Sequence, residues 1–238
     1  PDYTVIWKSI FHTVSAFCNA GFSLNQESLR IYSNTPAIIS VFIVLIVLGG
    51  LGFPVLYNIF SIPFALSTKF RYRLSLHSKI VISSTLFLII AGWTIFALLE
   101  WNNTLRDMSL FEKLFVSLFH SVTPRTAGFN IVDIKQTTPA TQLTTILLMF
   151  IGGGSSSTAG GIKITTFTVL LLAALSIIKG KKDIEFMNRS IPEQTIREAI
   201  TIFICGTLCI VLFLLGFFII EMPAQNKICL LYTSPSPR

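Results

Sequence analysis

Four long apolar blocks dominate the pattern of hydrophobic and polar positions along the chain. Residues 36–60 contain no charged side chain, and residues 80–99 and 199–220 are equally free of charge. Residues 136–178 contain a single charge, Lys163. An α-helix rises about 1.5 Å per residue, so about 20 apolar residues cross the roughly 30 Å hydrocarbon core of a bilayer. We therefore predict helical spans within these four blocks.

Two shorter apolar segments, residues 5–18 and 110–122, each lead into a turn that contains glycine. They are helix-like but too short to cross a bilayer. Apolar helices of this length are typical of re-entrant or interfacial segments. Together with the long blocks they predict a repeated unit of span, short helix, glycine turn and span.

The composition agrees with a membrane protein that crosses the bilayer several times. Hydrophobic residues make up 52% of the 238 positions, and charged residues make up 12%, about half of the roughly 25% found in soluble domains. Too few charges are present to cover a soluble surface, so a soluble domain, a disordered chain and a disulfide scaffold are excluded. The net charge of +7 does not indicate nucleic acid binding, because the bases lie between apolar blocks rather than on one soluble face.

The distribution of bases predicts the orientation in the membrane. Nine lie in two loops, between the first and second blocks and between the third and fourth: Lys69, Arg71, Arg73, Lys79, Lys179, Lys181, Lys182, Arg189 and Arg197. Five lie on the other side: Lys8, Arg30, Arg106, Lys113 and Lys135. The positive-inside rule places the first group in the cytoplasm. Four crossings fit this assignment, and the short helices then enter from the outer face.

An internal repeat relates the two glycine turns. Residues 11–22 are FHTVSAFCNAGF and residues 119–129 are FHSVTPRTAGF, one residue fewer. Each copy follows a short apolar segment and precedes a polar stretch and a long block. A duplicated re-entrant turn favours a symmetric pore over structural loops of no transport function.

The repeat predicts a cation filter. Removing water from a small cation inside a membrane is costly unless oxygen atoms replace that water, and successive backbone carbonyls can do so. The backbone must then adopt dihedral angles that glycine reaches at little cost. The candidate filter residues are Asn19, Ala20, Gly21, Thr126, Ala127 and Gly128.

A run of small residues interrupts the third apolar block. Residues 152–161 are GGGSSSTAGG, and the phosphate-binding pattern GxxxxGK[ST] fails because Ile162 follows Gly161. Such a run unwinds a span, which is tolerated at membrane depth only beside water or protein. Two interpretations remain open: close packing of small residues between helices, and a flexible loop under the filter that opens or blocks the pore.

The charged and histidine side chains near these motifs indicate their roles less specifically than the motifs do. Lys163 either extends toward the cytoplasm or acts near the loop. Arg125 lies two residues before Ala127, and we interpret it as a brace for the second filter turn. His12 and His120 occupy equivalent repeat positions, where we expect packing with a hydrogen bond rather than metal ligation.

These motifs resemble the Trk/Ktr potassium transporter family. The resemblance rests on residues 15–22 (SAFCNAGF), 123–129 (TPRTAGF) and 152–163 (GGGSSSTAGGIK), and extends from Val5 to about Ile220. It implies an all-α membrane protein of repeated span, pore-helix, filter-loop and span units related to K⁺ channels. Cys18 stands where this family often has asparagine. The missing first and fourth filters imply a fragment that cannot close a pore by itself.

The resemblance also implies function and partners. It implies potassium as the transported ion, no cofactor and no metal beyond K⁺ at the filter, in a multi-pass protein of the bacterial cytoplasmic membrane. It implies a homodimer with cytoplasmic nucleotide-binding regulatory subunits, which the basic loops could contact, although topology and anionic lipid account for those bases equally well. The implied gating loop consists of Gly152, Gly153, Gly154, Ser155, Ser156, Ser157, Thr158, Ala159, Gly160, Gly161 and Lys163.

The expected organisation follows from these units. Residues 1–60 form the second unit from its pore helix onward, 61–79 a cytoplasmic loop, and 80–178 the whole third unit with a broken second span. Residues 179–198 form a second cytoplasmic loop, and 199–228 the first span of a fourth unit, which we expect to end near Glu221 and Pro223. Residues 229–238 resemble a translated sequencing adaptor, and we interpret them as non-native.

Other functions remain as alternatives. A K⁺/Na⁺ channel, or a Na⁺-coupled or Na⁺-permeable transporter of the same fold, would need the same turns. A membrane-embedded enzyme would need paired carboxylates or a nucleophile with its base at membrane depth, and residues 36–99 and 136–178 contain no such acidic pair within the apolar blocks. A receptor or structural protein would not need the duplicated turn. We therefore predict a transporter and not an enzyme.

Overall fold

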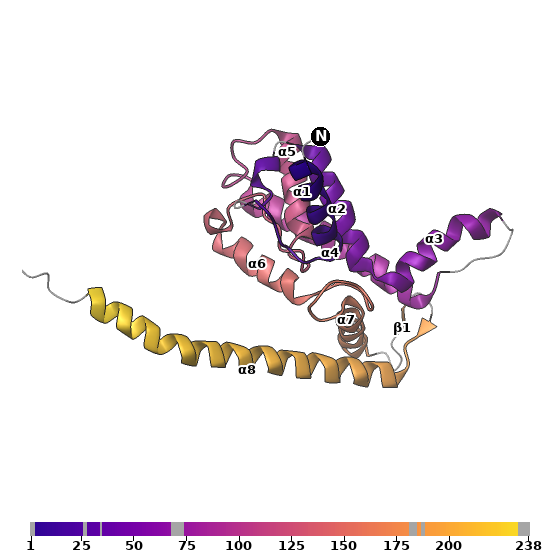
Figure 1. Ribbon diagram of the computed structural model, residues 1–238. Coiled ribbons are helices and arrows are strands. Elements are labelled where there is room, and N and C mark those ends of the chain that lie inside the picture. The colour runs from indigo at the N-terminus through magenta and orange to yellow at the C-terminus, as the bar shows by residue number, and fades with distance from the viewer. Residues whose placement is uncertain are drawn as a thin grey trace, which may run out of the picture. The chain divides into compact units, whose positions relative to one another are not determined.

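The computed structural model describes residues 3–25, 28–33, 35–67, 74–180, 185–186 and 189–232 (Figure 1). They form two compact units, residues 1–171 and 172–238. The described chain is mostly helical, as predicted. Its departure from an all-α fold is an antiparallel hairpin of β1 (Glu185–Phe186) and β2 (Arg189–Ser190).

Several sequence-based expectations lie outside the described residues. The loop bases Lys69, Arg71, Arg73, Lys181 and Lys182 are among them, as are the last six residues of the segment interpreted as non-native. The orientation in the membrane therefore stays a prediction.

Two short helices belong to the first unit. They are α1 (Tyr3–Phe17) and α5 (Leu110–Val122), which match the two short apolar segments of the sequence. A capping box begins α5: the Ser109 hydroxyl accepts from the Glu112 N–H, and the Glu112 carboxylate accepts from the Ser109 N–H. Hydrogen bonds from the Ser109 backbone and side chain lower the pKa of Glu112. The capping box satisfies backbone N–H groups that have no partner inside the helix.

The first long block is not one straight span, contrary to expectation. It forms α2 (Pro36–Leu51) and α3 (Phe53–Ser67), bent by 108° at Gly52. Gly52 has φ +88°, and a Cβ added there would lie 2.5 Å from the Ser155 carbonyl oxygen. Pro54 in the first turn of α3 is compatible with a new helix start. The block therefore breaks where the backbone of Ser155 comes close, at a glycine that has no side chain to prevent this approach.

The remaining blocks form four helices. The second block is α4 (Leu76–Glu100), which begins with Ser75 accepting from the Ser78 N–H. The third block is divided into α6 (Pro139–Phe150) and α7 (Ile164–Ile178), with the glycine- and serine-rich run between them. Short 3₁₀ turns, η1 (Arg30–Tyr32) and η2 (Ile134–Gln136), lie in the polar stretches.

The fourth block belongs to the long helix α8 (Glu193–Tyr232). The expected end near Glu221 and Pro223 was wrong, because helical backbone continues beyond both. A proline removes one backbone hydrogen bond, but the residues on either side can stay helical. The first four residues of the segment interpreted as non-native are part of this helix.

In the described part of the chain, two helices are long and apolar enough to cross a membrane. They are α4 and residues 193–219 of α8, and the bent pair α2–α3 makes a third if it counts as one span. The remaining predicted crossing, the third block, corresponds to α6 and α7, which are individually shorter.

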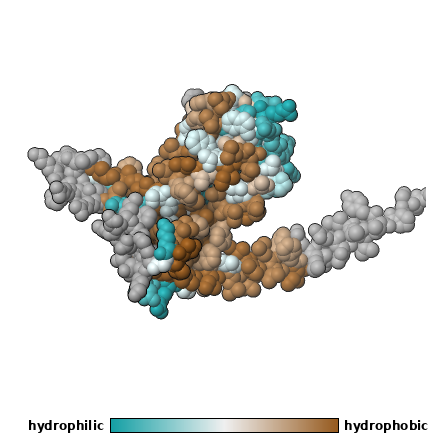
Figure 2. Space-filling view, turned by 180° about the vertical axis from the view of Figure 1, so that it is seen from behind, coloured by the Kyte–Doolittle hydropathy of each residue, from teal (hydrophilic) through white to brown (hydrophobic). Residues whose placement is uncertain are grey.

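Apolar side chains cover much of the described surface. Figure 2 shows a broad hydrophobic surface, with hydrophilic residues gathered in smaller areas. Leu98 and Phe213 are 80% and 81% exposed, and the most apolar window of α8 has no buried residue. Large exposed apolar areas mark surfaces that contact other apolar matter. Together with the two long apolar helices, they indicate a membrane protein.

The core of the first unit lies between α2, α4, α5 and the loop that follows α5. Phe119, Val122 and Phe129 are buried there against Ile39 and Phe42 of α2. The short helix α5 also packs tightly on α4: the Ser121 hydroxyl donates to the Ile89 carbonyl at 2.6 Å, and the Trp93 indole donates to the Leu114 carbonyl at 3.0 Å. These contacts place the end of α5 inside the unit.

A buried carboxylate joins α4 to α6. Glu100 has 0% exposure. Its Oε1 accepts from the N–H and hydroxyl of Thr138 and from the Thr141 hydroxyl, at 2.8, 3.0 and 2.6 Å. Its Oε2 accepts from Asn103 Nδ2 at 2.7 Å and from the Thr104 hydroxyl at 2.9 Å. Thr138 is the N-cap of α6, so the negative charge also faces the positive end of that helix dipole.

Replacing Glu100 by glutamine should destabilise the protein. The amide NH₂ of glutamine must face hydrogen-bond donors whichever way the group turns, because both carboxylate oxygens accept. We expect a loss of about 1–3 kcal/mol of unfolding free energy, measured as a lower melting temperature of the purified protein in detergent. Glu112→Gln is the matched control, since that carboxylate is exposed. Equal shifts in the two variants would contradict the assigned role of Glu100.

Candidate functional site

The first predicted filter turn follows α1. Asn19 and Gly21 have positive φ, +51° and +73°. The Ser15 hydroxyl donates to the Phe22 carbonyl at 2.8 Å, and His12 Nε2 accepts from the Leu24 N–H at 3.3 Å. The end of α1 thus holds the residues on the far side of the turn.

The second predicted turn follows α5 and has a matching set of contacts. Thr126 and Gly128 have φ of +74° and +77°. The Thr123 hydroxyl donates to the Phe129 carbonyl at 2.6 Å, and His120 Nε2 accepts from the Val132 N–H at 3.3 Å. An accepting Nε2 carries no proton. The expected packing and hydrogen bonding of the two histidines are confirmed.

The two turns lie against each other. A Cβ added to Gly21 would lie 2.5 Å from the Ala127 carbonyl oxygen, and one added to Gly128 would lie 3.5 Å from the Gly21 Cα. Beyond the turns, the Leu29 N–H donates to the Asn130 carbonyl at 3.1 Å. Segments about a hundred residues apart therefore bring the six candidate filter residues together.

Arg125 reaches from the second turn to α4. Its side chain is buried, with 6% exposure, and Nη2 donates to the Thr85 hydroxyl at 3.3 Å. Nε has no partner among the described residues. The guanidinium also lines a small cavity with Gly50 and Gly153, so it lies between the second turn, α2 and the glycine- and serine-rich run.

The glycine- and serine-rich run packs on the break between α2 and α3. The Gly154 N–H donates to the Gly50 carbonyl at 2.8 Å, and the Phe53 N–H donates to the Ser156 carbonyl at 3.2 Å. Its two ends are also joined, since the Gly152 N–H donates to the Ile162 carbonyl at 2.9 Å. The run is therefore a closed loop with a paired neck, and its glycines permit close packing of backbones. This arrangement agrees with close packing of small residues, and the interpretation of the run as a gate stays a prediction.

The same run also touches both turns. Asn19 Nδ2 donates to the Thr158 hydroxyl at 2.9 Å, and that hydroxyl donates to the Phe17 carbonyl at 3.0 Å. The Gly160 N–H donates to the Thr126 hydroxyl at 3.2 Å. Thr158 lies 139 positions from Asn19, and no spacing in the sequence signals this pairing.

Lys163 is bonded to the loop itself. Its Nζ donates to the Ala159 carbonyl at 2.8 Å, and the side chain is partly buried. Lys163, which follows the paired neck, thus binds the backbone of its own loop at Ala159. In the described part of the chain, no three His, Cys, Asp or Glu side chains gather into a metal-binding group.

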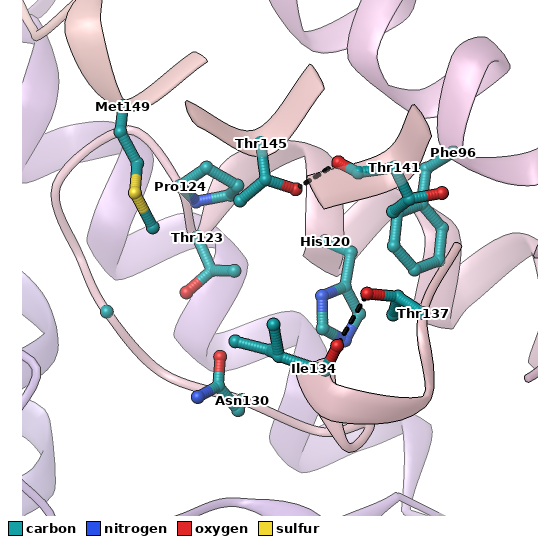
Figure 3. Close-up of a pocket in the computed structure, with 11 residues that line it drawn as sticks. Phe96, His120, Thr123, Pro124, Asn130, Ile134, Thr137, Thr141, Thr145 and Met149 are labelled. Atoms are coloured by element: carbon teal, nitrogen blue, oxygen red, sulfur yellow. Dashed lines mark hydrogen bonds between the residues drawn. The ribbon is translucent and has the colours of Figure 1, made fainter. Parts of the chain in front are cut away.

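A cavity lies behind the second turn (Figure 3). It has a volume of about 100 Å³ and is bounded by the end of α5, the second turn and α6. Its polar lining includes His120, Thr123, Asn130, Thr137 and Thr145. Neighbouring hydroxyls are satisfied by backbone: Thr137 donates to the Ile134 carbonyl and Thr145 to the Thr141 carbonyl. The cavity is large enough for several water molecules, which places polar space beside the turn.

Sequence reasoning missed two residues of this region, Thr158 as an individual contact and Glu100 as the link between α4 and α6. Glu100 had one available signal. It is an acidic residue at the end of an apolar block, and a threonine-rich segment begins the next block. A buried carboxylate needs donors of this kind.

Comparison with known proteins gives consistent results. The sequence profile described as "Cation transport protein" (TrkH) matches residues 2–234. The Ktr system potassium uptake protein B of Bacillus subtilis is 39% identical over 92% of this chain and 48% of its own length. The potassium/sodium uptake protein NtpJ of Enterococcus hirae is 41% identical over 87% of this chain and 45% of its own length.

A solved structure supports the fold. The potassium transporter TrkH of Vibrio parahaemolyticus superposes with a TM-score of 0.77 and 21% identity, over 90% of this chain and 46% of that one. The chain spans about half the length of the relatives that it matches. The profile covers nearly the whole chain, and the chain therefore belongs to the TrkH family of cation transport proteins.

Proposed function

We propose that this chain is part of a potassium uptake pore, with its two glycine turns acting as ion filters. The observation that carries the proposal is the contact between the turns, in which a Cβ added to Gly21 would lie 2.5 Å from the Ala127 carbonyl oxygen. In each turn, φ is positive at the first and third of the three candidate residues. Such alternation lets successive peptide groups face one side, and carbonyls on one side can replace the water around a potassium ion.

The proposed pore is built from repeated units. Each unit contributes a span, a short pore helix, a filter turn and a second span, as in K⁺ channels. The matching contacts made by His12 and His120 support equivalence of the two turns described. A complete pore needs further turns of this kind, which agrees with a chain that covers about half of its relatives.

The loop of residues 152–161, with Lys163, is the proposed gate. Its hydrogen bonds to both turns support a position next to the ion path. Arg125 is the proposed brace, since it joins the second turn to α4. In this proposal the carbonyls of the turns select the ion, and the loop controls whether the ion can pass.

The setting of the pore is also a proposal. We assign the protein to a bacterial cytoplasmic membrane as a multi-pass homodimer bound by cytoplasmic nucleotide-binding regulatory subunits. Potassium is the substrate, and the proposal includes no cofactor. The Bacillus subtilis relative, named as one protein of a Ktr system, supports a membrane subunit that works with others.

Permeation of sodium as well as potassium is the second candidate function. The observation that favours it is the 41% identity to a potassium/sodium uptake protein of Enterococcus hirae. Both functions use the same turns, so the ratio of K⁺ to Na⁺ uptake distinguishes them.

Gly128→Ser should reduce K⁺ over Na⁺ selectivity in the full-length transporter by roughly tenfold. A side chain at φ +77° costs about 1–2 kcal/mol of backbone strain, and relief of that strain moves the neighbouring carbonyls. Uptake of both ions in a bacterium deficient in K⁺ uptake measures the ratio. Gly180→Ser is the matched control, because Gly180 has φ +64° and nothing within 4 Å of an added Cβ. Unchanged selectivity of the Gly128 variant at normal expression would remove the filter assignment.

Deletion of residues 155–158 should increase K⁺ flux severalfold without changing which ion passes. The deletion removes the part of the loop beyond its paired neck and leaves both turns intact. Flux into proteoliposomes, with and without the regulatory subunit, is the measurement, and the subunit should have less effect on the variant. Loss of flux in correctly inserted protein would instead show that the run is structural packing.

A further inference from the structure

The two filter turns hold the loop through equivalent positions. Asn19 and Thr126 are each the residue two before the filter glycine, and each has a left-handed φ. Both side chains bond to the same short stretch of the loop, Thr158 to Gly160. The stretch meets one turn through a side-chain hydroxyl and the other through a backbone N–H.

The left-handed conformation explains why these side chains reach the loop. A residue with positive φ directs its side chain differently from the rest of a turn. Asparagine tolerates this conformation, whereas threonine rarely adopts it. Thr126 thus has a strained backbone, and its hydroxyl accepts a hydrogen bond from the loop. Strain of this kind is found where the backbone is held for a function.

The two contacts are suited to release. Thr158 and Gly160 are exposed. The hydrogen bond between Gly160 and Thr126 is exposed and the one between Asn19 and Thr158 is partly buried, so water can reach at least the loop side of each contact. The bonded arrangement also leaves two buried polar atoms, Asn19 Oδ1 and Ser157 Oγ, without a partner among the described residues. Release of the loop would let water reach both atoms. These features favour exchange between a bonded and a released arrangement of the loop.

We propose that the side chains of Asn19 and Thr126 are positioning residues that latch the loop shut against the two filter turns. This inference rests on the proposed gate and adds the contacts that hold the gate closed. Each latch residue contributes its carbonyl to the proposed filter and its side chain to the latch. A change in the filter backbone therefore alters the latch, and release of the loop alters the filter in return, since coupling between two sites is reciprocal.

Isosteric variants remove each latch without changing shape. Thr158→Val and Thr126→Val replace a hydroxyl by a methyl group and keep the β-branch, whereas Thr158→Ser keeps the hydroxyl and is the matched control. Thr158→Val also removes the hydrogen bond to the Phe17 carbonyl. Loss of one such hydrogen bond shifts an equilibrium by about fivefold, and loss of both latch bonds by about 25-fold if they are independent. Asn19→Gly removes the donor of the hydrogen bond to Thr158, and glycine tolerates the left-handed φ of this position.

Two readouts report on the latch in the full-length transporter. The first is K⁺ flux into proteoliposomes without the regulatory subunit. The second is the rate at which a thiol reagent modifies Ser157→Cys, in a background whose own cysteines are replaced. Ser157 Oγ is buried without a partner, so this reporter breaks no hydrogen bond of the described residues and becomes accessible when the loop is released.

The latch predicts that the valine variants and Asn19→Gly raise both flux and labelling about fivefold or more, and that Thr158→Ser stays near the parent. If deletion of residues 155–158 raises flux while the valine variants and Asn19→Gly leave both readouts unchanged, the latch is wrong and the gate stands. If that deletion also leaves flux unchanged, the gate is wrong and the latch falls with it. Equal effects of Thr158→Val and Thr158→Ser would overturn the latch as well. Such a result would mean that the size of the side chain matters and that its hydroxyl does not.

Discussion

Close approach of one backbone to another is the constraint on which this site depends. A Cβ added to Gly49 would lie 1.9 Å from the Phe17 carbonyl oxygen, and one added to Gly152 would lie 1.7 Å from the Gly160 carbonyl oxygen. Backbone that is not helical must find hydrogen-bond partners when it is buried in an apolar setting. Here the two turns and the loop supply partners to one another and to the break at Gly52. The three irregular segments are therefore stable together, and each would lack partners alone.

The helices around the site serve this arrangement. The short helix α5 is fastened to α4 by Ser121 and Trp93, and Glu100 fastens α4 to the start of α6. These contacts fix both ends of the segment that carries the second turn. The proposed carbonyl filter would need such rigidity, because its oxygens must keep their places when the water around an ion is removed. The proposed gate needs the opposite property. Its contacts to Asn19 and Thr126 are partly buried and exposed, and each turn makes fewer of them than the carboxylate of Glu100 makes.

Much of this organisation could be predicted from residue patterns. The two short helices were found because apolar runs of that length cannot cross a bilayer, and the repeated FH…AGF motif located both turns. The interruption of the third block followed from glycine and serine at membrane depth. Other features could not be predicted. The bend at Gly52 depends on the Ser155 carbonyl, a hundred residues away. Gly52 and Pro54 permit a bend in this block, but they do not by themselves require one. The continuation of α8 past Pro223 was also missed, because a proline weakens a helix without always ending it.

The amino-acid sequence by itself determined the class of protein, the two short helices, the apolar blocks and the positions of both turns and the loop. These properties depend on local composition and spacing, which a single chain displays directly. Only the tertiary structure decided that the turns touch at Gly21 and Ala127, that Thr158 pairs with Asn19, and that Glu100 receives the hydroxyls of α6. Those contacts join residues from 38 to 139 positions apart. Their geometry is set by the packing of whole helices, and no local pattern of residues encodes it.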